Sequence, residues 1–270
     1  MPGIDSKLLD ISYLEALSFL DSPVHRMDAR AKVITTMVFV GVVASFDRYA
    51  VVSLLPLLLF PLALVLSARL PCRFLLKRLL LVAPFALLIG ILNPLLDQRV
   101  LYHFGSIELT GGWISFVSIL LRFVLTVGTA LILIAITSMP GICNALERLG
   151  TQRIFALQLL LLYRYIFVLG QEAQRKERAR ALRSFHGRGK GLYVYGALLT
   201  QLLWRTIDRA QRVHRSMLCR GFNGQIHLLH TSRFSRKDGL FTFSWCLYFL
   251  AVRFLPTTAK THHWFGGVFG

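Results

Sequence analysis

Two six-residue segments that lie 37 residues apart share one pattern: an arginine, a small residue, a phenylalanine, a histidine or asparagine, and a glycine. They are Leu182–Gly187 (LRSFHG) and Cys219–Gly224 (CRGFNG). A guanidinium binds a carboxylate through two parallel hydrogen bonds and stays charged when partly buried. A phenylalanine beside it is suited to anchoring in an apolar pocket. Two like segments therefore predict two like receptors, with these candidate partner-binding residues: Arg183, Phe185, Arg220, Gly221 and Phe222.

The sequence lacks the motifs of nucleotide hydrolysis and of acid–base catalysis. Its only Gly-Lys pair, Gly189-Lys190, is followed by glycine, and Ser184 stands where a phosphate-binding loop needs its first glycine. No paired carboxylates stand within an apolar segment. Asp28 with His25 is the one candidate acid–base cluster, and Asp28 is better interpreted as a helix N-cap. We therefore expect a protein that is not an enzyme.

Metal ligation has weak support. His227 and His230 are three residues apart and His262 and His263 are adjacent, but solvated loops are the simpler interpretation of both pairs. The cysteines form no CxxC motif, which argues against a zinc site and against a disulfide framework; they are Cys72, Cys143, Cys219 and Cys246. We expect neither a metal site nor a cofactor in this chain.

Each arginine segment follows a stretch that is typical of a long helix. Residues 152–184 contain no proline and many strong helix formers, apolar first and then charged. Residues 192–219 repeat apolar positions at helical spacing, with arginines on the other side. The glycine that ends each segment, Gly187 or Gly224, is suited to a helix C-cap. A basic amphipathic helix that lies on anionic lipid headgroups is the alternative interpretation.

Composition predicts the class of protein. Of 270 residues, 55% are hydrophobic and 16% charged, and the mean hydropathy is +0.58. A soluble domain averages about 25% charged residues, so this chain is expected to be a polytopic membrane protein. Its net charge of +18 is segregated: residues 140–238 hold 18 Lys or Arg and 5 Asp or Glu, a net +13.

Five segments are long and apolar enough to be predicted as membrane spans, at residues 31–46, 49–68, 74–96, 113–137 and 240–255. The predicted fold class is an all-α membrane protein with about five transmembrane helices and a basic cytoplasmic domain of long amphipathic helices. The expected organisation is an N-terminal cytoplasmic segment (1–30), a four-helix transmembrane region (31–137), the basic domain (138–238), and a final span with its tail (239–270).

The distribution of basic residues predicts which side each loop occupies. Cytoplasmic loops are enriched in Lys and Arg, and the loop between the second and third spans carries Arg69, Arg73, Lys77 and Arg78. Residues 154–169 are apolar enough to span, but a span there would export the basic stretch 175–190. We therefore expect 154–169 on the cytoplasmic side. A further span at 192–204 would restore parity and is the alternative.

Two features within the predicted spans stand out. Arg122 lies inside the fourth span, where a charge is costly and often functional. Interhelix pairing and a transport role are both open interpretations of it. Asn93-Pro94 predicts a broken helix end near the outer face.

Three places in the sequence together resemble one protein family. The first is SPVHRMDARAK at residues 22–32, before the first span; the second is Thr137-Ser138-Met139-Pro140, where Thr137 or Ser138 can cap a helix that Pro140 opens. The third is the pair of arginine segments. The chain thereby resembles the transmembrane T component of energy-coupling factor (ECF) transporters, most closely the cobalt-type (CbiQ-like) branch. In the first place Ala29 stands where the family usually has Pro.

The resemblance implies an energy-coupling role in an ABC importer. The chain would join two cytoplasmic ATPase subunits, through Arg183 and Arg220 with Phe185 and Phe222 nearby, to a membrane substrate-binding subunit. The imported substrate would be a divalent transition-metal ion, most simply cobalt for cobalamin biosynthesis, with nickel or a vitamin as alternatives. The expected location is the cell inner (plasma) membrane, as a multi-pass protein within the lipid bilayer.

Other readings fit the residues less well. A stand-alone permease needs polar groups that converge on a path within the spans, and beyond Arg122 the sequence offers little for such a path. A membrane enzyme that holds an anionic substrate needs acid–base residues at the cytoplasmic boundary. We expect no nucleic acid as partner, because the arginines lie on helices beside the bilayer and form no groove lined by aromatic residues.

Overall fold

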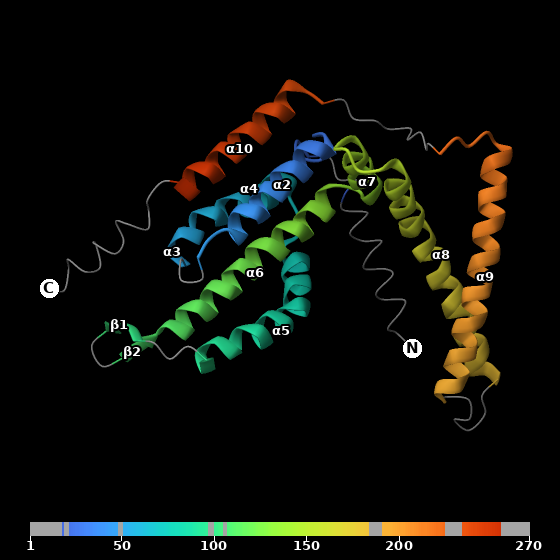
Figure 1. Cartoon of the computed structure of the whole chain (residues 1–270), viewed down its shortest axis with the longest axis horizontal. Coiled ribbons are helices and arrows are strands. Elements are labelled where there is room, and N and C mark those ends of the chain that lie inside the picture. Colours follow the sequence, from blue (N-terminus) through green and yellow to red (C-terminus); the bar gives the residue numbers. More distant parts are fainter. Residues whose placement is uncertain are drawn as a thin grey trace. The chain divides into compact units, whose positions relative to one another are not determined.

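The computed structural model describes residues 18, 22–47, 51–96, 100–104, 107–183, 191–224 and 234–254, and Figure 1 shows their course. The chain divides into two compact units. The bundle unit comprises residues 15–138 and 232–270, and the hairpin unit comprises residues 1–14 and 139–231. The described residues are mostly helical, with long apolar helices, which confirms the predicted all-α membrane protein.

The bundle unit is built from helices with one short antiparallel sheet. The helices are α2 (Ala29–Ala44), α3 (Val51–Leu54), the 3-10 turn η1 (Pro56–Leu58), α4 (Leu59–Ala68), α5 (Cys72–Leu96), α6 (Gly111–Ile136) and α10 (Arg236–Phe254). The sheet pairs β1 (Val100–Phe104) with β2 (Ile107–Thr110). It occupies the connection between α5 and α6, which the sequence leaves as a loop.

The hairpin unit contains three helices in its described residues: α7 (Met139–Arg148), α8 (Arg153–Arg183) and α9 (Leu192–Cys219). The bounds of α8 and α9 confirm the two helices predicted at 152–184 and 192–219. Pro140 lies in the first turn of α7, as its fixed φ angle predicts. Gly150 follows the end of α7 with a φ of +106°, a conformation that favours a residue without a Cβ atom.

Among the described residues, four helical segments have the length and apolar composition to cross a membrane: 51–68, 72–94, 111–136 and 153–183. The first three coincide with predicted spans. The remaining predicted spans form α2 and α10, which are shorter or less apolar, with 16 and 19 residues. The fourth segment is α8, and its location on the cytoplasmic side stays a prediction.

Helices α5 and α6 form a close pair. Gly90 of α5 faces the Phe116 ring, and a Cβ atom at Gly90 would lie 2.9 Å from Cδ2 of that ring. Nearby, the Asn93 side-chain amide donates a hydrogen bond to the Ser115 hydroxyl at 3.4 Å. The predicted helix break at Asn93-Pro94 is wrong, because α5 continues through Pro94 to Leu96. The proline is accommodated within the helix, as membrane helices commonly allow.

A buried aromatic cluster fastens α10 to the rest of the bundle unit. Phe39 of α2, Phe60 of α4 and Phe249 of α10 are each buried, with ring centroids 4.9 to 5.2 Å apart. Trp245 of α10 adds an edge-on contact to Phe60 at 4.9 Å. Such tilted ring pairs stabilise beyond the area that they bury. Helix α10 therefore completes the same core as α2 and α4.

Two arginines from other helices reach the carboxyl end of α2. Arg253 of α10 donates a hydrogen bond to the Ser45 carbonyl at 3.2 Å and stacks over the Phe46 ring. Arg122 of α6 donates to the Asp47 carbonyl. Carbonyls at a helix end lack intrahelical partners and carry partial negative charge, so cations there are stabilising. The contact of Arg122 therefore joins α6 to the end of α2, in agreement with the interpretation of interhelix pairing.

Lys32 makes the corresponding contact at the carboxyl end of α6. Its side chain is buried, 4% exposed, and its ammonium donates to the Ile136 carbonyl at 3.0 Å and to the His25 carbonyl at 3.4 Å. The carboxylates of Asp28 and Asp238, both buried, supply the opposing negative charge. One residue of the 22–32 motif thus joins α2, α6 and the start of α10.

The two aspartates also stabilise the amino-terminal ends of helices. Asp28 is the N-cap of α2 and accepts a hydrogen bond from the Arg30 amide at 2.9 Å, which confirms its interpretation as a cap. Asp238 lies in the first turn of α10 and accepts from the Ser235 amide at 2.9 Å, which is one of the two hydrogen bonds of a capping box. The charge that starts each helix therefore also neutralises Lys32.

We predict that Gly90→Ala lowers the stability of the bundle unit. The new methyl group must displace the Phe116 ring, and overpacking of this kind costs about 1 to 3 kcal/mol. The thermal unfolding midpoint in detergent should fall. Gly128→Ala on α6 is the matched control, because a Cβ there meets nothing within 4 Å. Equal midpoints for the two variants would contradict the close packing.

We predict that Lys32→Met destabilises the chain although it keeps most of the side-chain volume. The substitution leaves the Ile136 carbonyl and the buried Asp238 carboxylate without this cation, while Asp28 keeps its ion pair with Arg30 at 3.7 Å. We expect a loss of about 3 kcal/mol. Thermal unfolding in detergent measures it. Lys77→Met removes an exposed ammonium from α5 and serves as control. A Lys32→Met midpoint as high as that of the control would show that the buried contact carries no stability.

Candidate functional site

The two arginine segments are positioned by the antiparallel pair α8 and α9 (Figure 1). Near the connection between the helices, Arg180 of α8 donates a hydrogen bond to the Tyr195 hydroxyl at 3.3 Å. Halfway along, Glu172 of α8 pairs with Arg205 at 3.2 Å and Arg209 at 3.6 Å. As the residue number falls along α8, that of its partner on α9 rises. This register establishes that the helices run in opposite directions.

The connecting end of the helical hairpin is held by charge. Arg180 donates to the Glu177 carboxylate one turn earlier, and its guanidinium lies over the Tyr195 ring, 5.0 Å from the centroid. The hydrogen bonds from Arg180 hold the pKa of Glu177 below its usual value and raise the pKa of Arg180. Both groups therefore stay ionised at neutral pH, and the contact between α8 and α9 persists there.

Arg183 is the last residue of α8, and its side chain is exposed. It lies at the connecting end of the hairpin. Phe185, the predicted anchor beside it, lies outside the described residues, as does Gly187. Of the first arginine segment, the structure therefore describes the helix end and the guanidinium that it presents.

Arg220 lies where α9 ends, in a Schellman motif. The Phe222 amide donates to the Met217 carbonyl at 3.0 Å, and the Gly221 amide donates to the Leu218 carbonyl at 3.0 Å. Gly221 has a φ of +76°, a conformation that side chains strain. The prediction that Gly224 caps the helix is wrong, because Gly221 takes that place. Arg220 itself is exposed.

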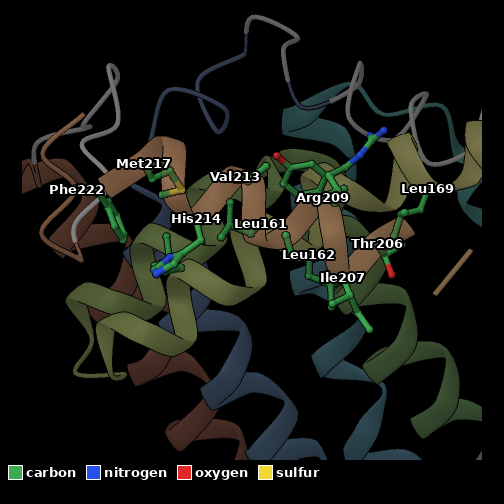
Figure 2. Close-up of a pocket in the computed structure, with 13 residues that line it drawn as sticks. Leu161, Leu162, Leu169, Thr206, Ile207, Arg209, Val213, His214, Met217 and Phe222 are labelled. Atoms are coloured by element: carbon green, nitrogen blue, oxygen red, sulfur yellow. The ribbon is translucent and has the colours of Figure 1, made fainter. Parts of the chain in front are cut away.

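Phe222 turns back onto its own hairpin. It is half-buried and lines a groove of about 420 Å³ between α8 and α9, together with Met217. Figure 2 shows Phe222, Met217 and His214 at one end of this groove and Leu169 with Thr206 at the other. We call it the apolar groove, lined by Leu157, Leu161, Leu162, Tyr165, Leu169, Thr206, Ile207, Arg209, Ala210, Val213, His214, Met217 and Phe222. Arg220 is left as the projecting group at this end.

The two arginines lie at opposite ends of the hairpin. Arg183 lies beside the start of α9 and Arg220 at its end, and α9 has 28 residues. At 1.5 Å per residue, the separation is about 42 Å. The structure therefore does not bring the two predicted segments together, and each end presents its arginine to a different region of space.

A second groove, of about 380 Å³, was missed from the sequence. We call it the basic groove; it is lined by Val168, Gln171, Glu172, Arg175, Lys176, Ala179, Arg205 and Arg209. The sequence does contain a pattern that indicates it. On α8 the apolar positions 161, 165 and 168 lie on one face of the helix, and Glu172 and Arg175 continue that face at the same spacing. Four cations surround one carboxylate there.

Metal-binding and thiol chemistry find little support in the described part of the chain. No three His, Cys, Asp or Glu side chains gather there to hold a metal ion. The histidine pairs 227/230 and 262/263 lie outside the described residues. The four cysteines are free thiols, and burial raises the pKa of Cys143, which disfavours its reactive thiolate.

Comparison with known proteins identifies the family. A family model described as CbiQ, cobalt transport protein, matches residues 21–231. A search of curated proteins found no match. Because the family model covers most of the chain, the protein belongs to the CbiQ cobalt transport family. It is a multi-pass membrane component of a transport system.

We predict that Gly221→Ala loosens the end of α9. An alanine in the left-handed conformation costs about 1 kcal/mol, which corresponds to roughly fivefold faster exchange of the Phe222 amide. Hydrogen exchange of the full chain measures this amide directly. Gly196→Ala is the control, because a Cβ inside α9 there meets nothing within 4 Å. Unchanged exchange in Gly221→Ala would contradict the Schellman geometry.

Proposed function

We propose that this CbiQ-family chain is the energy-coupling component of an ECF-type ABC importer. It joins two cytoplasmic ATPase subunits to a membrane substrate-binding subunit. The imported substrate is a divalent transition-metal ion, cobalt in the simplest case, with nickel or a vitamin as the alternatives. The family match to cobalt transport proteins over residues 21–231 supports the class of substrate.

The observation that carries the proposal is the placement of Arg183 and Arg220. Both are exposed, both end a long helix, and they are about 42 Å apart along the hairpin. A single pocket cannot receive both guanidinium groups. Two separate acidic pockets, one on each ATPase subunit, match this arrangement.

The hairpin is suited to transmitting a movement of its ends. Helices α8 and α9 have 31 and 28 residues, so each is a rod of more than 40 Å. Ion pairs from Glu172 to Arg205 and Arg209 tie the rods at mid-length. When ATP draws the two ATPase subunits together, the ends move with them, and the helices tilt against the substrate-binding subunit.

The proposed division of labour assigns the chemistry to partners. The ATPase subunits hydrolyse ATP, the substrate-binding subunit holds the metal ion, and this chain is non-catalytic. The excess of basic residues in 140–238 supports a cytoplasmic location for the hairpin unit at the inner membrane. The stand-alone permease would depend on Arg122, whose guanidinium is engaged with the Asp47 carbonyl.

We predict that charge reversal at the two helix ends releases the ATPase subunits. Arg183→Glu or Arg220→Glu places a carboxylate against an acidic pocket, which costs about 2 kcal/mol or more, roughly 30-fold in affinity. Each single change should weaken co-purification of the co-expressed ATPase subunits. The double change should abolish it, because sites so far apart act additively.

The matched controls are Arg212→Glu and Arg215→Glu, which make the same charge change at exposed positions within α9. They should retain the ATPase subunits. Loss of binding in these controls would indicate attraction to the whole basic surface and would overturn the two-ended coupling. A complex that survives the double change would do the same. Cellular uptake of cobalt against nickel then tests the substrate.

A further inference from the structure

The apolar groove and the basic groove adjoin along one seam of the hairpin. Arg209 lines both of them. On α8 the lining runs from Leu157 to Leu169 in the apolar groove and continues from Val168 to Ala179 in the basic groove. In Figure 2, the apolar side chains extend along the seam from Phe222 towards Leu169 and Thr206. The seam is thus apolar at one end and basic at the other.

The basic groove carries more positive charge than its own acid can neutralise. Glu172 is engaged by Arg205 and Arg209. Arg175 and Lys176 complete the lining, which gives four cations against one carboxylate. The Lys176 Nζ atom is buried and, among the described residues, has no hydrogen-bond partner. A buried ammonium of this kind favours an anion.

The apolar groove has the length of a lipid chain. From Leu157 to Leu169 the helix rises about 18 Å, comparable to the roughly 15 Å depth of one leaflet's hydrocarbon. Its lining is aliphatic and aromatic apart from Thr206, Arg209 and His214. A free phosphate ion would use the cations and leave these apolar walls exposed to water.

We propose that the seam between α8 and α9 binds an anionic phospholipid. The phosphate lies in the basic groove against Lys176, Arg175 and Arg209, and one acyl chain lies in the apolar groove towards Phe222. Guanidinium and ammonium groups are the usual phosphate ligands in proteins. Such a lipid would connect α8 to α9 along the same stretch where Glu172 links the two helices through Arg205 and Arg209.

The test measures lipid retained by the purified full-length chain. The protein is mixed in detergent with phosphatidylglycerol or with phosphatidylcholine of the same acyl chains, and native mass spectrometry counts the bound lipid. We expect one phosphatidylglycerol to be retained in preference to phosphatidylcholine. Arg175→Gln with Lys176→Gln should weaken its binding about tenfold, the loss expected for charge-assisted hydrogen bonds. Ala210→Phe, which fills the apolar groove and keeps every cation, should weaken it as well.

Arg212→Gln with Arg215→Gln is the matched control, since it removes the same charge from α9 outside both grooves. It should retain the lipid. Equal loss of phosphatidylglycerol in this control would show that the lipid is held by the overall positive charge of the hairpin and not by a defined site. Equal retention of phosphatidylcholine would show that the headgroup is not recognised. Either result would overturn the proposal. Full displacement by inorganic phosphate, with Ala210→Phe unaffected, would make it a free-anion site. Binding of an acidic peptide in place of the lipid would assign the seam to a protein partner.

Discussion

The contact between the Lys32 ammonium and the Ile136 carbonyl is the one on which the arrangement of the bundle unit depends. It joins residues 104 positions apart in the sequence. The ammonium is buried, so it stays charged only because Asp28 and Asp238 offset its charge and two carbonyls accept hydrogen bonds from it. Each of those aspartates also caps a helix. The geometry at the ends of α2, α6 and α10 is therefore specified together.

The same solution recurs at the other end of α2. Arg253 and Arg122, from α10 and α6, donate to carbonyls just beyond that helix. In an apolar bundle, water does not satisfy the last carbonyls of a helix, so neighbouring helices must. The cations that look misplaced within apolar segments have this role. Together with the aromatic cluster of Phe39, Phe60 and Phe249, they fix the relative depth of the helices.

Local sequence patterns predicted the helices well, because apolar periodicity and turn residues act within a few positions. The bounds of α9 and the cap at Asp28 followed from such signals. Contacts between residues far apart in the sequence could not be predicted from such local patterns. The acceptor of Lys32 and the return of Phe222 onto α8 depend on which helices pair and in what register, and the basic groove arises only once α8 and α9 are aligned. Asn93-Pro94 misled for the opposite reason: its local signal for a break is outweighed by packing on α6.

The antiparallel course of α8 and α9 has a consequence of symmetry. Two antiparallel rods that carry like sequences at their carboxyl ends are related by an approximate two-fold axis across the middle of the hairpin, near Glu172. An isologous dimer has such an axis as well. A single chain of this kind can therefore match both halves of a symmetric partner at once without forming a dimer itself. The two ends differ in sequence, with Ser184 in one where the other has Gly221. This difference limits how closely the two ends can make the same contacts with the two halves of such a partner.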